Sequence, residues 1–436
     1  MFQRLTHRVT GRFVVVAAIL MVACAQSADT DWTKIETKFV PLQSVRQVLT
    51  PGCFDRTLWH VFPVGVKGAA ADTGLPHGGM DKTGKPRPAI VAKFAKDVVF
   101  IDFTGDGKST AENTKRITPE GWSDPFQCDL NFDDGSTAKY AFRIKTVIEG
   151  EKYAILRAGA RTFEFGGKTV TLFDDDGNGL YNDAGRDSVL VNGQPVCVLG
   201  KHIRIGEDTF ELIVHASGER VEIRPMPKDT VTGIIEPFEK YEPSQRSENL
   251  KLHTLIFYGP EGSFACDDTH RVIKAPAGLY DLVFGLFERN GELVYIKKGE
   301  KTSFTVTANI KTQLKWGGKI KAKFSLISDG EDVTLGVPHY FGQMSEEYFP
   351  DSTKQTVCSA RISQVYRDRT NFDIEGFVPF GAKKFETLPD GSFKPIIFKR
   401  YRTVNDEYEG YVEYTSGIMG RVEGKERLAF VYRKKK

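Results

Sequence analysis

Polar and apolar residues alternate along much of this chain, with the period of two that is typical of β-strands with one face toward water. Residues 139–144, 301–306, 319–324 and 426–432 show the alternation clearly. Turn-forming dipeptides separate such segments and favour tight hairpins, because Asn, Asp and Gly tolerate positive φ. They are Asp134-Gly135, Gly166-Gly167, Asn192-Gly193, Asn290-Gly291, Asp329-Gly330 and Asp390-Gly391. The pattern predicts a mainly β protein built from antiparallel sandwiches or barrels.

Helical periodicity is scarce, so we expect few short helices: two turns over residues 42–49 and one turn over residues 344–348. A mature chain of about 410 residues exceeds one core, which predicts two or more domains. Residues 237–250 are polar and short of core residues, and we place the domain boundary there. The predicted organisation is a signal peptide at 1–28, an N-terminal β domain at 29–236, a linker at 237–250 and a C-terminal β-sandwich region at 251–436.

The first 28 residues have the layout of a secretory signal peptide. Arg4, Arg8 and Arg12 precede an apolar run at residues 13–23, and small residues follow. That run is too short for a typical span of about 20 residues, and no later stretch would serve as a transmembrane span. We therefore expect an extracytoplasmic protein, located in the periplasm, at the cell surface or secreted.

Two processing routes compete at the end of this leader. The small residues around residues 23–28 suit an ordinary signal peptidase, whereas Met21-Val22-Ala23-Cys24 resembles a bacterial lipobox. The resemblance departs from the usual pattern at Met21, where Leu is common. If Cys24 is lipidated, its acyl chains would anchor the protein to a membrane surface.

The mature chain is neutral overall. The sequence contains 60 basic and 57 acidic residues, and the three arginines of the leader account for the excess. A neutral chain has no general attraction to nucleic acid, so we expect no nucleic-acid partner. The six cysteines are widely scattered without a C-x-x-C pair, and this spacing excludes a zinc knuckle and a dithiol redox site.

An acidic loop that begins at Asp174 is the strongest candidate for chemistry. Asp174, Asp176 and Asn178 occupy positions 1, 3 and 5 of the calcium-binding pattern D-x-[DN]-x-[DN]-G. Gly179 supplies the sharp turn at position 6, and Leu180 offers its backbone carbonyl at position 7. Calcium prefers hard oxygen ligands of this kind.

The end of the same loop departs from the usual pattern. Gly185 stands at position 12, where a bidentate Glu is normally found. This departure argues against an EF-hand between two helices and for a calcium loop on a β-hairpin, with Asp183 or Asp187 completing the shell. Carboxylates so close in sequence repel one another without a cation. The alternative interpretation is a polar hairpin rich in Asp-Gly and Asn-Gly.

A weaker copy of the pattern has Asp102, Thr104 and Asp106 at positions 1, 3 and 5. Thr104 is a poor substitute for an acid, and Lys108 opposes a cation. An ordinary turn is therefore the alternative at this second loop. Both loops follow apolar strand residues, which suggests a duplicated strand-loop unit.

The segment Ala275-Pro276-Ala277-Gly278-Leu279-Tyr280, with the apolar strand after it, resembles the P-x-G-x-Y turn into a strand of immunoglobulin-like and transthyretin-like modules in bacterial surface proteins. With the Asp/Gly/Asn loops, the chain resembles exported bacterial β-sandwich proteins whose roles are uncharacterised. The resemblance implies immunoglobulin-like sandwich domains and implies no activity.

The sequence contains no G-x-S-x-G, H-E-x-x-H or P-loop motif. We therefore expect an exported, non-enzymatic calcium-binding protein with a structural or ligand-binding role. Its 31 Phe and 15 Tyr could include exposed rings that stack on sugars, so a polysaccharide is the preferred ligand and a surface protein the other partner. The alternative is a secreted or surface-anchored hydrolase, a glycosidase or peptidase, because a glycosidase needs only two carboxylates about 5–10 Å apart.

Overall fold

The fold is taken from a computed structural model of the chain. It describes residues 31–54, 58, 60–63, 70–75, 90–95, 98–103, 106, 108–118, 121–148, 152–237, 251–329, 332–350, 358–367, 375–386, 394–399, 407–416 and 420–429. The predicted signal peptide with Cys24, and nearly all of the predicted linker, lie outside these residues. Every statement on the structure below concerns the described part.

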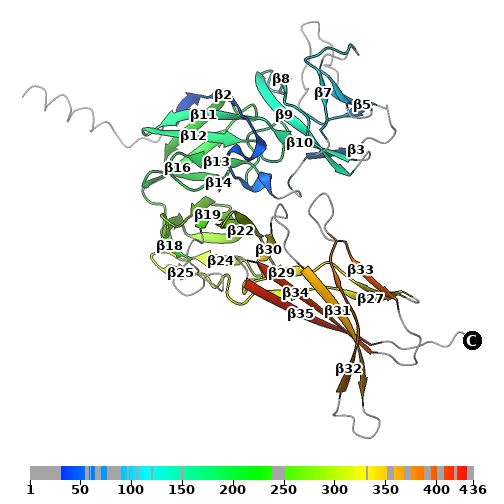
Figure 1. The fold of residues 1–436 in the computed structure, drawn as a ribbon. Helices are drawn as coiled ribbons and strands as arrows, with labels where there is room; N and C mark the ends of the chain where they lie inside the picture. Colours follow the sequence, from blue (N-terminus) through cyan, green and yellow to red (C-terminus); the bar gives the residue numbers. More distant parts are fainter. Residues whose placement is uncertain are drawn as a thin grey trace, which may run out of the picture.

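The chain is mainly β, as the alternation predicts. Its first part forms four antiparallel sheets, which lie in the upper half of Figure 1. In spatial order, the first sheet contains β1 (Thr33–Glu36), β17 (Arg220–Pro225), β16 (Asp208–Val214) and β15 (His202–Ile205), and the second contains β3 (His60–Pro63), β10 (Lys152–Arg157), β9 (Thr137–Ile148) and β8 (Phe126–Asn131). The third sheet contains β14 (Cys197–Val198), β13 (Ser188–Val191), β12 (Lys168–Phe173), β11 (Gly159–Phe165) and β2 (Lys38–Pro41). The fourth contains β4 (Ala70–Asp72), β5 (Val91–Ala95), β6 (Val98–Asp102) and β7 (Thr114–Arg116).

The second part also forms four sheets, shown in the lower half of Figure 1. One sheet contains β21 (Ile273–Pro276), β18 (Thr232–Glu236) and β25 (Lys311–Gln313). The largest contains β20 (Gly262–Cys266), β19 (Lys251–Gly259), β22 (Gly278–Arg289), β23 (Glu292–Lys297), β30 (Glu347–Pro350), β29 (His339–Phe341) and β26 (Lys321–Lys323), with β24 (Ser303–Val306) beside β22. A further sheet contains β27 (Leu326–Asp329), β28 (Asp332–Leu335) and β33 (Ile396–Lys399), and the last contains β32 (Glu375–Lys384), β31 (Cys358–Arg367), β34 (Glu407–Ser416) and β35 (Gly420–Ala429). The β18–β25 pair is parallel.

Buried apolar side chains form two large clusters. The first joins the sheets of residues 31–225, here called the N-terminal unit, and the second joins those of residues 232–429, the C-terminal unit. Ile235 of β18 belongs to the second cluster, although β18 precedes the predicted linker. The division at residues 237–250 stays a prediction.

A third apolar cluster lies between the two units. Phe54 and Val198 from the N-terminal unit pack with Ile256 and Phe284 from the C-terminal unit. Hydrogen bonds cross the same junction, including one of 2.6 Å from the Thr254 hydroxyl to the Val196 carbonyl. The units therefore share a packed, hydrogen-bonded interface.

Several predicted turns are confirmed. Gly135 and Gly193 adopt positive φ in the turns between β8 and β9 and between β13 and β14. Asn290 and Gly291 both have positive φ between β22 and β23, as a tight hairpin of this type requires. The dipeptide at 390–391 lies outside the described residues.

The two helical expectations are wrong in detail. Within residues 42–49 the structure has only the three-residue 3₁₀ turn η1 (Val45–Gln47), and η2 (Pro51–Cys53) follows it. Residues 342–346 form a turn that leads into β30, with Ser345 at φ 60°. The carboxylate of Glu346 is buried there and accepts hydrogen bonds from backbone N–H groups, which replaces helical hydrogen bonding.

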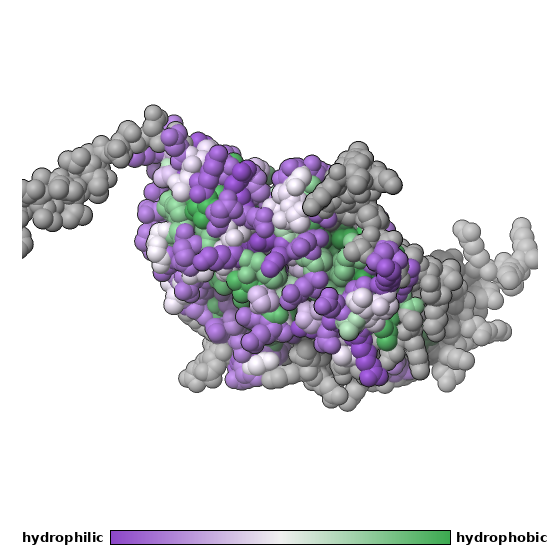
Figure 2. Space-filling view, turned by 90° about the horizontal axis from the view of Figure 1, so that it is seen from above, coloured by the Kyte–Doolittle hydropathy of each residue, from purple (hydrophilic) through white to green (hydrophobic). Residues whose placement is uncertain are grey.

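Within the described residues, no helix has the length and apolar character needed to cross a membrane. Seen from above in Figure 2, the protein presents a mostly hydrophilic face with separate apolar patches between polar side chains. The large hydrophobic side chains most exposed in the described part are all aliphatic, and Leu279 at 58% is the most exposed.

Candidate metal centre

The acidic loop joins β12 to β13, which pair antiparallel with Phe173 opposite Ser188. Asp174 directly follows Phe173, and Asp187 directly precedes Ser188, so the hairpin itself brings these two acids face to face. The loop therefore lies on a β-hairpin and not between two helices, as the absence of a Glu at position 12 predicts.

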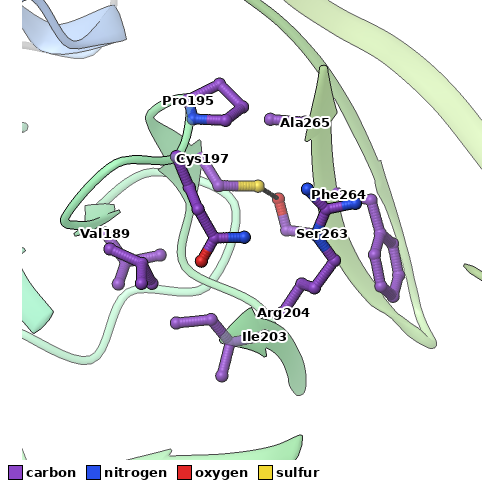
Figure 3. Close-up of a pocket in the computed structure, with 10 residues that line it drawn as sticks. Val189, Pro195, Cys197, Ile203, Arg204, Ser263, Phe264 and Ala265 are labelled. Atoms are coloured by element: carbon purple, nitrogen blue, oxygen red, sulfur yellow. Dashed lines mark hydrogen bonds between the residues drawn. The ribbon is translucent and has the colours of Figure 1, made fainter. Parts of the chain in front are cut away.

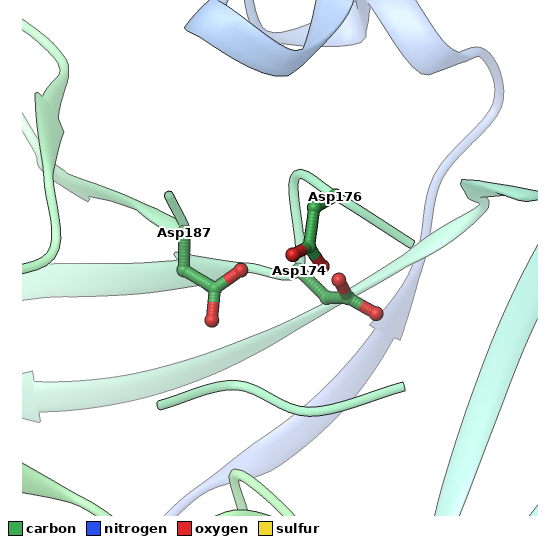
Figure 4. A group of neighbouring side chains, drawn as sticks. All are labelled: Asp174, Asp176 and Asp187. Carbon is green, nitrogen blue, oxygen red and sulfur yellow. The ribbon is translucent and has the colours of Figure 1, made fainter. Parts of the chain in front are cut away.

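Three carboxylates of this loop form one compact group. Asp174, Asp176 and Asp187 each offer an oxygen, and these oxygens all lie within 4.8 Å of one another. Figure 4 shows Asp187 reaching in from one side and the other two acids from the turn opposite. All three residues are buried, with exposed fractions of 2% or less. In the described part of the chain, this is the one group of three or more acidic, His or Cys side chains with such spacing.

Backbone N–H groups hold all three of these carboxylates in place, and Asp176 accepts one such hydrogen bond of 3.2 Å from Asn178 N. Asp174 accepts hydrogen bonds of 2.7 Å from Gly177 N and 2.8 Å from Gly179 N. Asp187 accepts from Asp175 N and Asp183 N at 3.2 and 2.9 Å. Both glycines have positive φ, at 74° and 87°, so the predicted turn at Gly179 is present together with a second one at Gly177.

The electrostatic environment of the group is unfavourable for charge. Burial and the charge of Asp176 raise the pKa of Asp174 well above its usual value, and burial with the charge of Asp174 does the same to the pKa of Asp187. Burial also raises the pKa of Asp176, which Arg186 partly offsets through an ion pair of 3.0 Å. The three acids have this one ion-pairing cation among the described residues.

The remaining predicted ligands lie beside the group. The Oδ1 of Asn178 accepts a hydrogen bond of 2.7 Å from Leu180 N, and its amide nitrogen donates to Asp176 and Asp183. Of the two acids expected to complete the shell, Asp187 belongs to the group, whereas Asp183 bonds to Asn178 at its edge.

Two tyrosines that the pattern could not reveal also reach this site. Tyr140 of β9 donates a hydrogen bond of 2.6 Å to Asp174. The buried Tyr181 hydroxyl has no hydrogen-bond partner in the described structure, and burial and the charge of Asp174 raise its pKa. A buried phenol oxygen without a partner, close enough to Asp174 and Asp187 for their charges to raise its pKa, fits a site that a bound cation completes.

Asp175, between two members of the group, points into a different environment. The Arg157 guanidinium bonds to its carboxylate, as do the hydroxyls of Thr50 and Ser188. Both charged side chains are almost fully buried. The fold therefore gives Asp175 an environment separate from that of Asp174 and Asp176, with a buried counter-charge of its own.

The second predicted loop is described only in part. Asp102 is buried at the end of β6, and the exposed Asp106 accepts a hydrogen bond of 2.8 Å from Lys108 N. Thr104 lies outside the described residues. Asp102 and Asp106 belong to no metal-ligating group of described residues, so calcium at this loop stays a prediction.

A small pocket lies at the junction between the two units. Cys197 and Arg204 line it from the N-terminal unit and Ser263 from the C-terminal unit, and Figure 3 shows the 2.9 Å hydrogen bond between the Cys197 sulfur and the Ser263 hydroxyl. Its volume of about 30 Å³ suits little more than water. Burial raises the pKa of Cys197 to about 12, so the thiol is no nucleophile at neutral pH.

A scan against protein-family models and a search for relatives among curated proteins found no match for this chain. The functional argument therefore rests on the residues of the site.

Proposed function

We propose that this chain is an exported, non-enzymatic β protein that binds a structural calcium ion in the loop from Asp174 to Asp187. The observation that carries the proposal is the buried group of three carboxylates with a single cationic partner, Arg186. At an effective dielectric of about 20, each pair of charges at this separation costs roughly 3–4 kcal/mol. A divalent cation would remove that repulsion, and oxygen-only ligands favour calcium.

The ligands that we assign to the ion are Asp174, Asp176 and Asp187. Asn178, Asp183 and the Leu180 carbonyl complete the proposed shell, as the loop pattern predicts. The ion would tie the ends of the hairpin together and would fasten the chain near His60, whose N–H donates to the Asp176 carbonyl at 2.6 Å. Binding energy should therefore appear as folding energy.

The burial of these acids favours a structural ion over hydrolysis. A glycosidase pair must face a cleft that admits a sugar, whereas these carboxylates are at most 2% exposed. A hydrolase that uses other carboxylates remains the alternative function. Turnover of a glycan or peptide by the purified chain, abolished by one carboxylate substitution, would establish it.

The location and the fold type belong to the same proposal. The leader supports export, with lipidation of Cys24 as one route, and the intact mass of cell-derived protein distinguishes the two routes. The P-x-G-x-Y segment supports an immunoglobulin-like sandwich. In that segment β22 begins at Gly278, and buried Tyr280 donates a hydrogen bond of 3.0 Å to the Pro276 carbonyl.

A melting experiment on the mature chain tests the calcium site. Calcium at 100 times its dissociation constant should stabilise the protein by about 2.7 kcal/mol relative to excess chelator. For a unit of about 200 residues this corresponds to a rise in Tm of about 5–10 °C. Asp176→Ala should remove most of the rise, whereas the exposed Asp229→Ala serves as the matched control. Equal melting temperatures of the parent in chelator and in millimolar calcium would refute the proposal.

We also propose that the protein acts through ligand binding at the cell surface or in the periplasm, with a polysaccharide as the preferred ligand. The exposed large hydrophobic side chains in the described structure include no aromatic ring. Recognition of a sugar chain would therefore depend on polar and charged side chains more than on stacking against exposed rings.

A further inference from the structure

One face of four neighbouring strands, β23, β30, β29 and β26, combines basic and aromatic side chains, and at its β23 end Tyr295 packs against Phe54 of the N-terminal unit. Pairing places Lys297 opposite Glu347, Glu347 opposite Phe341, and Phe341 opposite Lys321, which makes one row across the sheet. A second row contains Tyr295 opposite Phe349 and His339 opposite Lys323. We call these eight residues the basic-aromatic face. Buried residues such as Tyr348 alternate with them and point into the core.

Ring contacts orient two of the three lysines of this face. The Lys297 ammonium lies 4.8 Å from the centre of the Phe349 ring, and the Lys323 ammonium lies 4.9 Å from that of Phe341. Tyr295 stacks on Phe349 with ring centres 5.0 Å apart. These contacts fix the ammonium groups at the surface and leave the rings engaged with their neighbours.

The surrounding sequence strengthens the positive charge. Residues 301–328 contain six lysines and no acid. Lys319 and Lys321 are exposed and have no carboxylate partner among the described residues. The acid of the face, Glu347, forms a hydrogen bond with His339, which raises the pKa of His339 above its usual value.

We propose that the basic-aromatic face binds a linear acidic polysaccharide, with Lys297, Lys321 and Lys323 contacting its carboxylates. The proposal rests on the ligand-binding role proposed above and names the site and the class of glycan. From β23 to β26 the face spans three strand spacings, about 14 Å, which is long enough to contact several charges of an extended polyanion.

Two features favour an acidic polysaccharide over other polymers. A single-stranded nucleic acid is usually held by bases that stack on open ring faces. Here the described rings are covered by lysines or by one another, whereas the fixed ammonium groups, the His339 imidazole and the Glu347 carboxylate can meet the carboxylates and hydroxyls of a sugar chain. A neutral glycan would leave the charges of the lysines unused.

The test measures binding of the mature chain to hyaluronate, a linear polysaccharide in which every second sugar has a carboxylate, by titration calorimetry at about 50 mM and about 300 mM NaCl, in chelator. The variant combines Lys297→Gln, Lys321→Gln and Lys323→Gln. The control removes the same charge from exposed lysines outside the C-terminal unit, at Lys108, Lys139 and Lys228. Dextran serves as the neutral glycan and poly-dT as the nucleic acid.

We expect binding to hyaluronate that weakens with salt, falls by about tenfold or more in the triple variant and stays unchanged in the control. Equal binding by the variant and the control would overturn the assignment of the face. Binding to poly-dT alone would overturn the class of ligand, and binding to dextran alone would overturn this inference while supporting a polysaccharide role. Because the assay runs in chelator, failure of the calcium site leaves its outcome readable, and unchanged melting temperatures verify that the variants are folded.

Discussion

Asp175 and Asp176 are neighbours in the sequence, yet the same substitution should have opposite consequences at the two positions. Asp175→Asn removes the charge that neutralises the Arg157 guanidinium, whose side chain is 2% exposed. Removing one partner of a buried ion pair costs about 3–5 kcal/mol, because the other charge stays buried without compensation. At about 2–4 °C per kcal/mol for a unit of this size, we expect Tm to fall by about 6–20 °C.

Asp176→Asn removes a charge that burial disfavours and that repels two other carboxylates. In chelator its Tm should therefore equal or exceed that of the parent, even though the Arg186 ion pair is lost, since Arg186 is half exposed and such pairs contribute little. In calcium the order reverses, because the parent gains the binding energy and Asp176→Asn does not. Asp175→Asn should show the same rise in Tm on addition of calcium as the parent, starting from a lower Tm in chelator.

Differential scanning calorimetry measures Tm for four proteins: the parent, both variants and the exposed control Asp229→Asn. For each protein, Tm in chelator is compared with Tm in calcium. The reasoning fails if both variants melt at the same temperature in chelator. It also fails if Asp175→Asn abolishes the calcium response while Asp176→Asn retains it. Either result would mean that the protein does not treat the two acids as separate environments.

Two further predictions concern the backbone and pH. Gly177→Ala should lower the free energy of unfolding by on the order of 2 kcal/mol, because φ is 74° and the added Cβ would lie 2.3 Å from the Ile155 carbonyl oxygen. Gly135 also has positive φ, but the space around it is open, so urea unfolding should show a smaller loss for Gly135→Ala. Burial raises the pKa of Glu346, so the folded state holds a proton that the unfolded chain releases above about pH 4.5, and stability falls as pH rises through the folded pKa. The parent should therefore gain stability relative to Glu346→Gln as the pH is lowered from neutral toward about 4.5 in urea unfolding, and a constant difference would contradict this.

The strands and hairpins could be predicted because they depend on local chemistry. The alternation at residues 139–144 lies within β9, and the Asn290-Gly291 dipeptide forms the turn between β22 and β23. Expectations failed where tertiary contacts decided the conformation. Residues 42–49 form no two-turn helix, because the Val45 and Val48 carbonyls accept hydrogen bonds from Arg157, a residue over a hundred positions away.

The candidate site shows the same limit at the level of single side chains. Spacing predicted Asp174 and Asp176 as ligands, with Asp183 or Asp187 to complete the shell, because a hairpin loop is local. The antiparallel pairing of Phe173 with Ser188 is what brings Asp187, and not Asp183, into the group. Spacing could not show that Asp175 has its own counter-charge, since Arg157 and Thr50 come from elements that only the fold brings near. The loop pattern thus indicates where oxygen ligands gather. In this loop the protein supplies a buried arginine to Asp175 alone, and the absence of such a buried counter-charge at Asp174, Asp176 and Asp187 among the described residues is the basis of the proposed cation site.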